Sequence, residues 1–297
     1  MLPTLRQLQY LKLLADHRSF SRAAEAAHVT QPTLSAGVHE LEKILGAPVV
    51  DRARSGVILT PVGEEAVSRA AQILAQAEDL VQAAASAGQP LSGRFRLGVI
   101  PTVAPFLLPR ALPLLRERFP KLRLYLREDL TQRLIAALKA GALDAALIAL
   151  PYDTQGLETA QVAQDALLAA VPASHPLSQA VSIAPERLEG DELILLEDGH
   201  CLREHALAAC GLDNPRGSTD GAFAATSLST LVQMVGSGLG VSLLPAMAVN
   251  AGLTDHVPIS IRPLDALRPS RDIVVCWRAG SSRGVEGRLL AEALRAA

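Results

Sequence analysis

The sequence predicts a mixed α/β protein made of a small helical part, one long helix and a larger domain of alternating strands and helices. Three observations lead to this fold class: short capped helices within the first 60 residues, a regular apolar stripe after Pro61, and strands that alternate with helices from Arg94 onward. With 297 residues, 49% of them apolar, the chain can bury a large core and form two or three domains.

The first two predicted helices are short. Leucines recur every three residues from Leu5 to Leu14, which places them on one face of an amphipathic helix. Ser19 or Ser21 can cap a second helix, which runs through an alanine-rich stretch and ends near His28.

A third helix follows at once. Thr30 can cap its start, Pro32 stands in its first turn where a missing N–H costs little, and Gly46 supplies its end. Two short helices joined by a tight turn form a helix-turn-helix, for which a generic helical hairpin is the alternative.

A hairpin of two strands is predicted between Pro48 and Leu59, where two β-prone runs flank a basic Ser-Gly turn. Beside a helix-turn-helix such a hairpin is a wing, and it completes a domain that we place at residues 1–60. Its Arg52 and Arg54 can lie on DNA phosphates or in a minor groove, or belong simply to a solvated hairpin.

A long helix starts at Thr60 and Pro61, which supply an N-cap and a proline at the first helical position. From Ala66 to Ala84 its apolar residues alternate spacings of four and three, which is a heptad pattern. A solitary helix with this stripe is marginal in water, so we expect it to pair with its copy in a second subunit. We place this linker and dimerisation helix, with its hinge, at residues 61–91.

Alternating strands and helices from Arg94 onward predict an α/β domain at residues 92–297 with mostly parallel strands. We divide this domain into lobe one, residues 92–163 and 268–297, and lobe two, residues 164–267. The glycines from Gly236 to Gly240 predict a tight helix-to-strand turn, because a dinucleotide fingerprint would need the reverse order of elements.

The stretch from Gly199 to Gly211 holds two of the three cysteines. It predicts a helix with Cys201 at its N-terminus, where backbone N–H groups, Arg203 and His200 would favour the thiolate. Cys210 lies nine residues later, which in a continuous helix means about 13 Å of rise and opposite faces. Because a disulfide tolerates at most about 7 Å between α-carbons, joining the two thiols must unwind the helix.

Two other interpretations of these cysteines stay open. They can be small core side chains, as we expect of Cys276 in the apolar run that ends at Trp277. They can also hold a metal with His200 and His205, although no Cys-x-x-Cys spacing is present and Cys210 would have to leave the helix. We therefore expect no metal and no cofactor.

Four segments together resemble the winged helix-turn-helix and linker helix of the LysR-type transcriptional regulators. They are Ser19–Glu25, Val29–Ser35, Leu41–Glu42 and Thr60–Gly63. The resemblance covers the full length and implies DNA binding, a two-lobed effector domain similar to solute-binding proteins, and a site in the cleft between the lobes. It also implies a pseudo-palindromic promoter site, a homodimer or homotetramer, and RNA polymerase as a further partner.

The third helix is then the one that reads DNA bases, through the polar edge of its first turns. Residues 1–60 carry seven Arg or Lys against five acidic residues, so charge alone would not indicate DNA. A bidentate contact from a glutamine would supply about 1 to 3 kcal/mol of discrimination between bases. We expect the base contacts to come from Gln31, Pro32, Thr33, Ser35 and His39.

Within that family, the segment Leu196–Arg203 together with Cys210 resembles the members that sense hydrogen peroxide. The resemblance implies that Cys201 reacts with peroxide and that Cys210 resolves the product as a disulfide. It also implies a peroxide pocket around Cys201. The residues that match this pocket are Thr102, Thr131, His200 and Arg278.

We therefore predict a DNA-binding regulator that hydrogen peroxide switches through Cys201 and Cys210. Two alternatives remain, a regulator that binds a small molecule in the cleft and a thiol peroxidase. The helix-turn-helix and linker helix argue against an enzyme, because catalytic turnover needs neither. The sequence has no apolar run long enough for a bilayer and no signal-peptide pattern, so we expect no membrane association and a cytoplasmic protein with reduced thiols.

Overall fold

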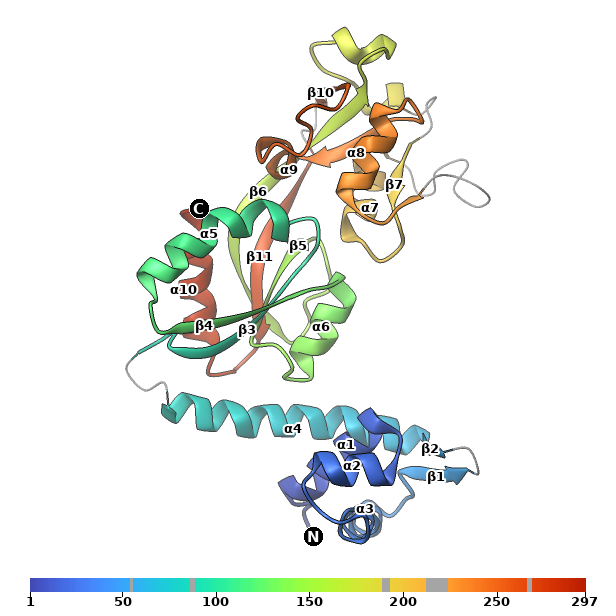
Figure 1. Cartoon of the computed structure of the whole chain (residues 1–297), viewed down its shortest axis with the longest axis vertical. Helices are drawn as coiled ribbons and strands as arrows, with labels where there is room; N and C mark the ends of the chain where they lie inside the picture. Colours follow the sequence, from blue (N-terminus) through green and yellow to red (C-terminus); the bar gives the residue numbers. More distant parts are fainter. Residues whose placement is uncertain (54–55, 86–88, 189–192, 212–223, 266–268) are drawn as a thin grey trace. The chain divides into compact units, whose positions relative to one another are not determined.

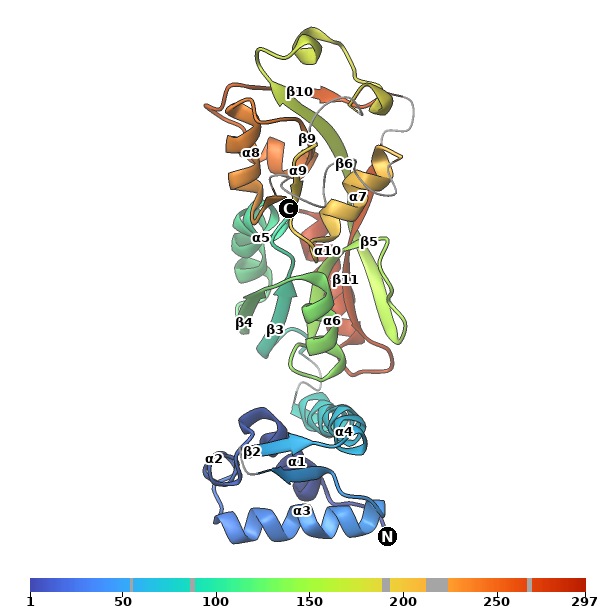
Figure 2. The same cartoon turned by 90° about the vertical axis from the view of Figure 1, so that its right-hand side faces the viewer.

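The computed structural model of the chain describes residues 1–53, 56–85, 89–188, 193–211, 224–265 and 269–297. They form two compact units, one made of residues 1–87 and 139–142 and the other of residues 88–138 and 143–297. Figure 1 labels the elements of both units, and Figure 2 shows them after a quarter turn. Among the described residues, no helix offers an apolar stretch long enough to cross a bilayer.

The N-terminal unit holds three short helices, a hairpin and one long helix. These are α1 (Leu5–His17), α2 (Phe20–Ala26), α3 (Gln31–Leu45), β1 (Val50–Ala53), β2 (Gly56–Leu59) and α4 (Pro61–Ala85). This order confirms the predicted winged helix-turn-helix followed by a long helix. The core lies between α1, α2 and α3, where Leu11, Leu14 and Leu34 are fully buried.

Caps and glycines explain where these helices begin and end. The side chains of Ser19 and Thr30 accept backbone hydrogen bonds at the starts of α2 and α3. Gly46 ends α3 with a φ of 72°, a left-handed conformation that glycine adopts without strain. In the first turn of α4, a Cβ on Gly63 would stand 1.9 Å from the carbonyl oxygen of Val49, so only glycine lets the two segments approach.

Lobe one of the C-terminal unit is a sheet covered by helices. Its strands are β3 (Gly93–Val99), β4 (Leu122–Glu128), β5 (Ala145–Leu150), β11 (Ser270–Arg278) and the first part of β6 (Leu157–Pro172), in the order β4-β3-β5-β11-β6. β3 is parallel to β4 and β5, whereas β11 is antiparallel to β5 and β6. The helices are α5 (Ala104–Arg118), α6 (Thr131–Lys139) and α10 (Gly284–Arg295) (Figures 1 and 2).

The second part of β6 builds lobe two, where it pairs antiparallel with β9 (Ser242–Pro245) and β10 (Ile259–Pro263). A short parallel pair, β7 (Leu195–Leu196) and β8 (Ala224–Ala225), lies beside it. The remaining elements are η1 (Pro176–Gln179), η2 (Pro185–Leu188), α7 (Cys201–Ala209), α8 (Leu228–Gly236) and α9 (Ala246–Asn250). Because α8 ends at Gly236 and β9 follows, the glycines there form the predicted helix-to-strand turn.

Strand β6 runs through both lobes without a break. Its residues 157–166 pair with β11, and residues 168–172 pair with β10. The lobe boundary that we placed after residue 163 therefore falls inside a strand rather than in a loop. The two lobes share this strand as part of one sheet.

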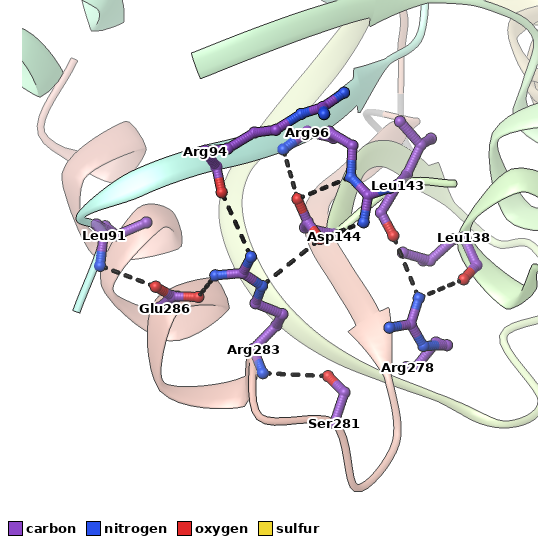
Figure 3. A network of polar contacts seen from close by, with 10 residues as sticks. All are labelled: Leu91, Arg94, Arg96, Leu138, Leu143, Asp144, Arg278, Ser281, Arg283 and Glu286. Atoms are coloured by element: carbon purple, nitrogen blue, oxygen red, sulfur yellow. Dashed lines mark hydrogen bonds and ion pairs between the residues drawn. The ribbon is translucent and has the colours of Figure 1, made fainter. Parts of the chain in front are cut away.

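A largely buried cluster of charges ties the start of β3 to α10 (Figure 3). We call it the α10 cluster, and its members are Arg96, Asp144, Arg283 and Glu286. The Arg96 guanidinium donates to the Asp144 carboxylate at 2.9 and 3.2 Å, and Arg283 Nε lies 3.5 Å from the same carboxylate. Arg283 also pairs with Glu286, whose other oxygen accepts a hydrogen bond from Leu91 N at 3.0 Å. The cluster thereby holds the backbone at residue 91 against α10.

Candidate functional site

Helix α7 carries the two predicted thiols at its two ends. It begins at Cys201, directly after the turn at Gly199 (φ 93°) and the N-cap His200, and its C-cap is Cys210. Gly211 follows with a φ of 67°, so the chain leaves the helix where the sequence predicts. The rise of about 13 Å over nine residues is twice the reach of a disulfide.

The two thiols lie in different cores. Neither forms a disulfide, and their exposures are 5% for Cys201 and 4% for Cys210. Cys201 belongs to the apolar core of lobe one, whereas Cys210 belongs to a core of lobe two that includes Leu188 and Leu195. The sulfurs therefore face away from each other, as opposite faces of one helix require.

Cys201 faces polar side chains that come from separate segments of the chain. Arg271, at the start of β11, is their centre: it donates to Thr102 Oγ1 at 2.8 Å and to the Asp165 carboxylate at 2.9 and 3.1 Å. These three residues, which we call the thiol cluster, are each no more than 3% exposed. Thr131, the first residue of α6, adds a buried hydroxyl.

Burial dominates the protonation of Cys201. It raises the pKa of the thiol, and the carboxylate of Glu204 acts in the same direction. The positive charge of Arg271 and the hydroxyl of Thr131 lower that pKa. The start of a helix therefore does not by itself produce a thiolate here, and the resting group is a thiol.

The two neighbours that we expected to favour the thiolate do not supply positive charge to it. Arg203 pairs with Asp198 at 3.0 Å and donates to the carbonyl of Leu196 at 3.2 Å. Burial lowers the pKa of His200, so its ring is neutral at neutral pH. The charge beside the thiol comes instead from Arg271, on a distant strand.

Two buried side chains near Cys201 have polar atoms without a hydrogen-bond partner of good geometry in the described part of the chain. They are Thr131, at its hydroxyl, and His205, at both ring nitrogens. His205 lies one helical turn after Cys201, on the same face of α7. Burial and then the charge of Arg271 lower its pKa, so the ring is neutral and offers one donor and one acceptor. A small molecule that both donates and accepts hydrogen bonds would satisfy these groups.

Arg278 does not belong to this site. Its guanidinium donates to the carbonyls of Leu138 and Leu143 at 2.8 and 3.2 Å, beside the α10 cluster (Figure 3). It lies seven residues from Arg271 along β11, which amounts to about 23 Å in a strand and puts the two side chains on opposite faces. The prediction that Arg278 lines the pocket is therefore wrong, because the arginine at the other end of the strand takes that place.

Sequence reasoning missed Arg271, Asp165 and His205. A signal for Arg271 was present, since strand alternation places it on the same face as Ile273 and Trp277, which are buried. A charged side chain on an inward face needs a partner of opposite charge, and Asp165 supplies it from β6. His205 was considered only as a metal ligand, and the described residues contain no group of three or more His, Cys, Asp or Glu that could hold a metal.

Helix α3 buries Leu34, Val38 and Leu41 and turns its other sides outward. Ser35 is half-exposed, and the other residues predicted to read bases are exposed: Gln31, Pro32, Thr33 and His39.

Those side chains do not all share one face. Gln31, Ser35 and His39 follow one another at spacings of four and line one side of α3. The hydroxyl of Thr33 instead lies 2.8 Å from that of Thr30, within the N-terminal cap of the helix. Thr33 therefore has a capping contact in addition to any contact with DNA.

The wing and the long helix are described in part. Arg54 lies outside the described residues, and only the backbone of Arg52, in β1, is described. On α4 the apolar stripe divides: Ala70 is buried in the core of its own unit, whereas Leu80 and Val81 are 74% and 66% exposed. The exposed half of the stripe is the part that the core of this unit does not cover.

Comparison with known proteins identifies both units. Residues 5–64 match the model of the bacterial regulatory helix-turn-helix protein, lysR family, and residues 88–297 match the LysR substrate binding domain. The chain is 43% identical over 249 residues to the HTH-type transcriptional regulator EstR of Acinetobacter baylyi, covering 84% of this chain and 82% of that protein. It is 38% identical over 295 residues to the hydrogen peroxide-inducible genes activator of Escherichia coli O6:H1, covering 98% and 95%. A full-length OxyR variant from Pseudomonas aeruginosa superposes with a TM-score of 0.80 at 38% identity, covering 99% and 95%.

Proposed function

The chain belongs to the LysR family of bacterial transcriptional regulators, and from this premise we propose that it senses hydrogen peroxide by forming a reversible Cys201–Cys210 disulfide. The observation that carries the proposal is that two cysteines outside any disulfide stand at opposite ends of one short helix, with buried polar atoms beside the first of them. The similarity to a hydrogen peroxide-inducible genes activator along almost the whole chain supports it.

The pocket for peroxide is formed by residues around Cys201. Thr131 and His205 offer buried polar atoms, Thr102 is fixed by Arg271, and His200 is the half-buried N-cap of α7. Hydrogen peroxide has two donors and several acceptor lone pairs in a volume little larger than water. It therefore matches a small, polar and largely enclosed site better than a larger metabolite does.

The chemistry proceeds in two steps. The Cys201 thiol first loses its proton, and the thiolate attacks one peroxide oxygen. An S–O bond forms as the O–O bond breaks, which gives a sulfenic acid, and the departing hydroxide takes up the proton that the thiol lost and becomes water. The sulfur of Cys210 then attacks the sulfur of Cys201 and displaces hydroxide, which leaves with the second thiol proton as water. Two thiols and one peroxide thus give one disulfide and two waters.

The second step must change the shape of lobe two. Because the helix is about twice as long as a disulfide can span, residues 201–210 must leave the helical conformation. Cys210 must also leave the apolar core that buries it, so the packing around Leu188 and Leu195 rearranges. This local rearrangement is the signal that alters the oligomer and its contacts with DNA.

DNA is recognised by α3, with Gln31, Ser35 and His39 toward the bases and Arg52 and Arg54 of the wing toward the phosphates. The exposed apolar half of α4 pairs two subunits, so the site is a pseudo-palindrome with half-sites about one helical turn, or a multiple of it, apart. The assembly is a homodimer or homotetramer in the cytoplasm that acts on RNA polymerase from its promoter site. It forms one disulfide per chain and does not turn over peroxide as an enzyme.

The test is mass spectrometry of the reduced full chain after brief treatment with near-stoichiometric hydrogen peroxide, paired with DNA footprints before and after. A Cys201–Cys210 disulfide with a changed footprint is expected. Cys201→Ser should abolish the response, Cys210→Ser should leave a sulfenic acid or higher oxide on Cys201, and Cys276→Ser is the matched control that should respond like the parent. Thiols that stay free would leave a regulator that binds a small molecule between the lobes.

A further inference from the structure

Asp165 occupies a fully enclosed position on β6 that the proposed sensing reaction does not use. Its Oδ2 accepts two hydrogen bonds from the Arg271 guanidinium, at 2.9 and 3.1 Å, and its Oδ1 accepts one from Met247 N, at the start of α9, at 2.8 Å. The side chain is 2% exposed. Both oxygens are therefore engaged within the protein, and the carboxylate is shielded from solvent.

The arginine that Asp165 holds is also the positive charge that lowers the pKa of Cys201. Arg271 uses one nitrogen for Thr102 Oγ1 and another for the Thr102 carbonyl, at 2.8 and 3.0 Å. Asp165 thus fixes the direction of the guanidinium from the side opposite Thr102. A buried arginine without this carboxylate would carry an unbalanced charge in an apolar surrounding.

We propose that Asp165 is a positioning residue that limits the reactivity of Cys201, because it aligns Arg271 on Thr102 and balances the charge that Arg271 presents to the sulfur. This inference rests on the proposed function, in which the Cys201 thiol is the group that reacts. The consequence is that Cys201 responds only above a certain peroxide concentration. A mostly protonated thiol reacts slowly when peroxide is scarce, and the ion pair sets the protonated fraction of this thiol.

Other titratable groups also lie near the thiol, and their effects on its pKa must be distinguished from the effect of Asp165. On α7 they are Glu204, which raises the pKa of Cys201, and His205 and His200, which burial keeps neutral. On the segment after β5 it is Tyr152, whose own pKa is raised by burial and then by Glu204 and Cys201, so it is an uncharged phenol at neutral pH. Asp165→Asn leaves the chemical identity of each of these groups unchanged.

The proposal predicts opposite effects for the two partners of one ion pair. Asp165→Asn removes the negative charge behind Arg271, so the pKa of Cys201 should fall by up to about one unit. Since a less basic thiolate is also a weaker nucleophile, the rate of alkylation at neutral pH should rise about threefold. Arg271→Gln should raise the pKa and slow the reaction. A merely structural role for the pair would instead shift both variants in the same direction.

The double variant completes the test. Asp165→Asn with Arg271→Gln leaves no charge at the pair, and of the two partners Arg271 is the one that acts directly on the pKa of Cys201. The pKa of Cys201 should therefore increase in the order Asp165→Asn, parent, double variant, Arg271→Gln. If Asp165→Asn alone does not fold, the comparison of the double variant with Arg271→Gln still isolates the charge of Asp165 in a background without the arginine.

The measurement is the pH profile of iodoacetamide alkylation of the reduced full chain, followed by peptide mass spectrometry. Trypsin cuts after Arg203, which separates Cys201 from Cys210, and buried Cys276 reports any loss of folding. A pKa of Cys201 that Asp165→Asn raises, or that the removal of Asp165 leaves unchanged in both backgrounds, overturns the inference. Because alkylation needs no peroxide, failure of the parent chain to form a disulfide with peroxide refutes the proposed function separately.

Discussion

Lobe one contains two buried clusters of arginine and carboxylate groups, and they serve different purposes. In the α10 cluster every member belongs to lobe one, and the cluster holds the backbone at Leu91 (Figure 3). In the thiol cluster, Asp165 accepts a hydrogen bond from Met247 N in lobe two, and Arg271 acts on Cys201. The same pairing chemistry thus holds a chain segment near one end of β11 and acts on the pKa of the Cys201 thiol near the other.

The difference teaches that an arginine acquires its role from its place in the fold. Arg271 and Arg278 belong to one strand, yet one lies within the thiol cluster and the other caps carbonyls beside the α10 cluster. Variants in each cluster can therefore show whether the two clusters act separately.

The largest effect should be on stability, at the α10 cluster. Arg283→Ala leaves the buried carboxylates of Asp144 and Glu286 without their shared partner, which should lower the free energy of unfolding by about 3 to 5 kcal/mol. Denaturant unfolding of the full chain measures this change. The control is Arg69→Ala in an exposed ion pair of α4, which should cost less than about 1 kcal/mol. If the folded Arg283→Ala variant also oxidised Cys201 more slowly, the two clusters would not be separate.

The next effect should be on rate, at the thiol cluster. Arg271→Gln leaves burial unopposed and raises the pKa of Cys201, so oxidation by hydrogen peroxide at neutral pH should slow about tenfold. Rapid quenching with an alkylating agent and mass spectrometry gives the rate. Arg278→Gln, at the other end of β11, is the matched control and should oxidise at the parent rate. Equal slowing in both variants would assign the effect to the strand rather than to the charge.

A smaller rate effect should follow loss of the hydroxyl beside the sulfur. Thr131→Val keeps the volume of the side chain and removes the hydroxyl that, together with Arg271, lowers the pKa of Cys201. Oxidation should therefore slow about fivefold, which is equivalent to one hydrogen bond of about 1 kcal/mol. Thr159→Val, an exposed position on β6, is the control for the substitution itself. The same quenching assay measures both, and an unchanged rate for Thr131→Val would remove Thr131 from the pocket.

The smallest effect should be on stability in acid. Burial lowers the pKa of His205 in the folded protein, so the unfolded chain takes up this proton at a higher pH. The free energy of unfolding should therefore fall as the pH drops below about 6.5, and His205→Gln should reduce that fall. Melting temperatures of the parent and the variant between about pH 5 and pH 8 measure it. Identical curves would mean that protonation of His205 does not destabilise the folded protein.

Features that depend on neighbours in the chain could be predicted from the sequence. The caps at Ser19 and Thr30, the glycine after α3 and the turn before Cys201 all act within a few residues of their own position. The predicted winged helix-turn-helix, the long helix and α7 with its two thiols are correct for this reason.

The thiol cluster could not be predicted in that way. Arg271 and Thr102 are 169 residues apart, and only the order of strands in the sheet brings them together. Resemblance to known family members pointed to Arg278, because it stands in a distinctive segment after Trp277, whereas Arg271 has no local motif. The expectation of a resting thiolate failed for a related reason, since the burial of Cys201 comes from the core of lobe one and outweighs the helix start.

The unbroken course of β6 has a mechanical consequence for the C-terminal unit. A hinge between the lobes would have to bend this strand where its partner changes from β11 to β10, and bending there would break ladder hydrogen bonds on both sides. The strand therefore resists bending at this point, and the register shift in its pairing with β11 lies elsewhere, where Ile273 and Val274 pair with Ala163 and Gln161. A Cys201–Cys210 bond, as we propose it, would then deform the segment between the two sulfurs more than it deforms β6.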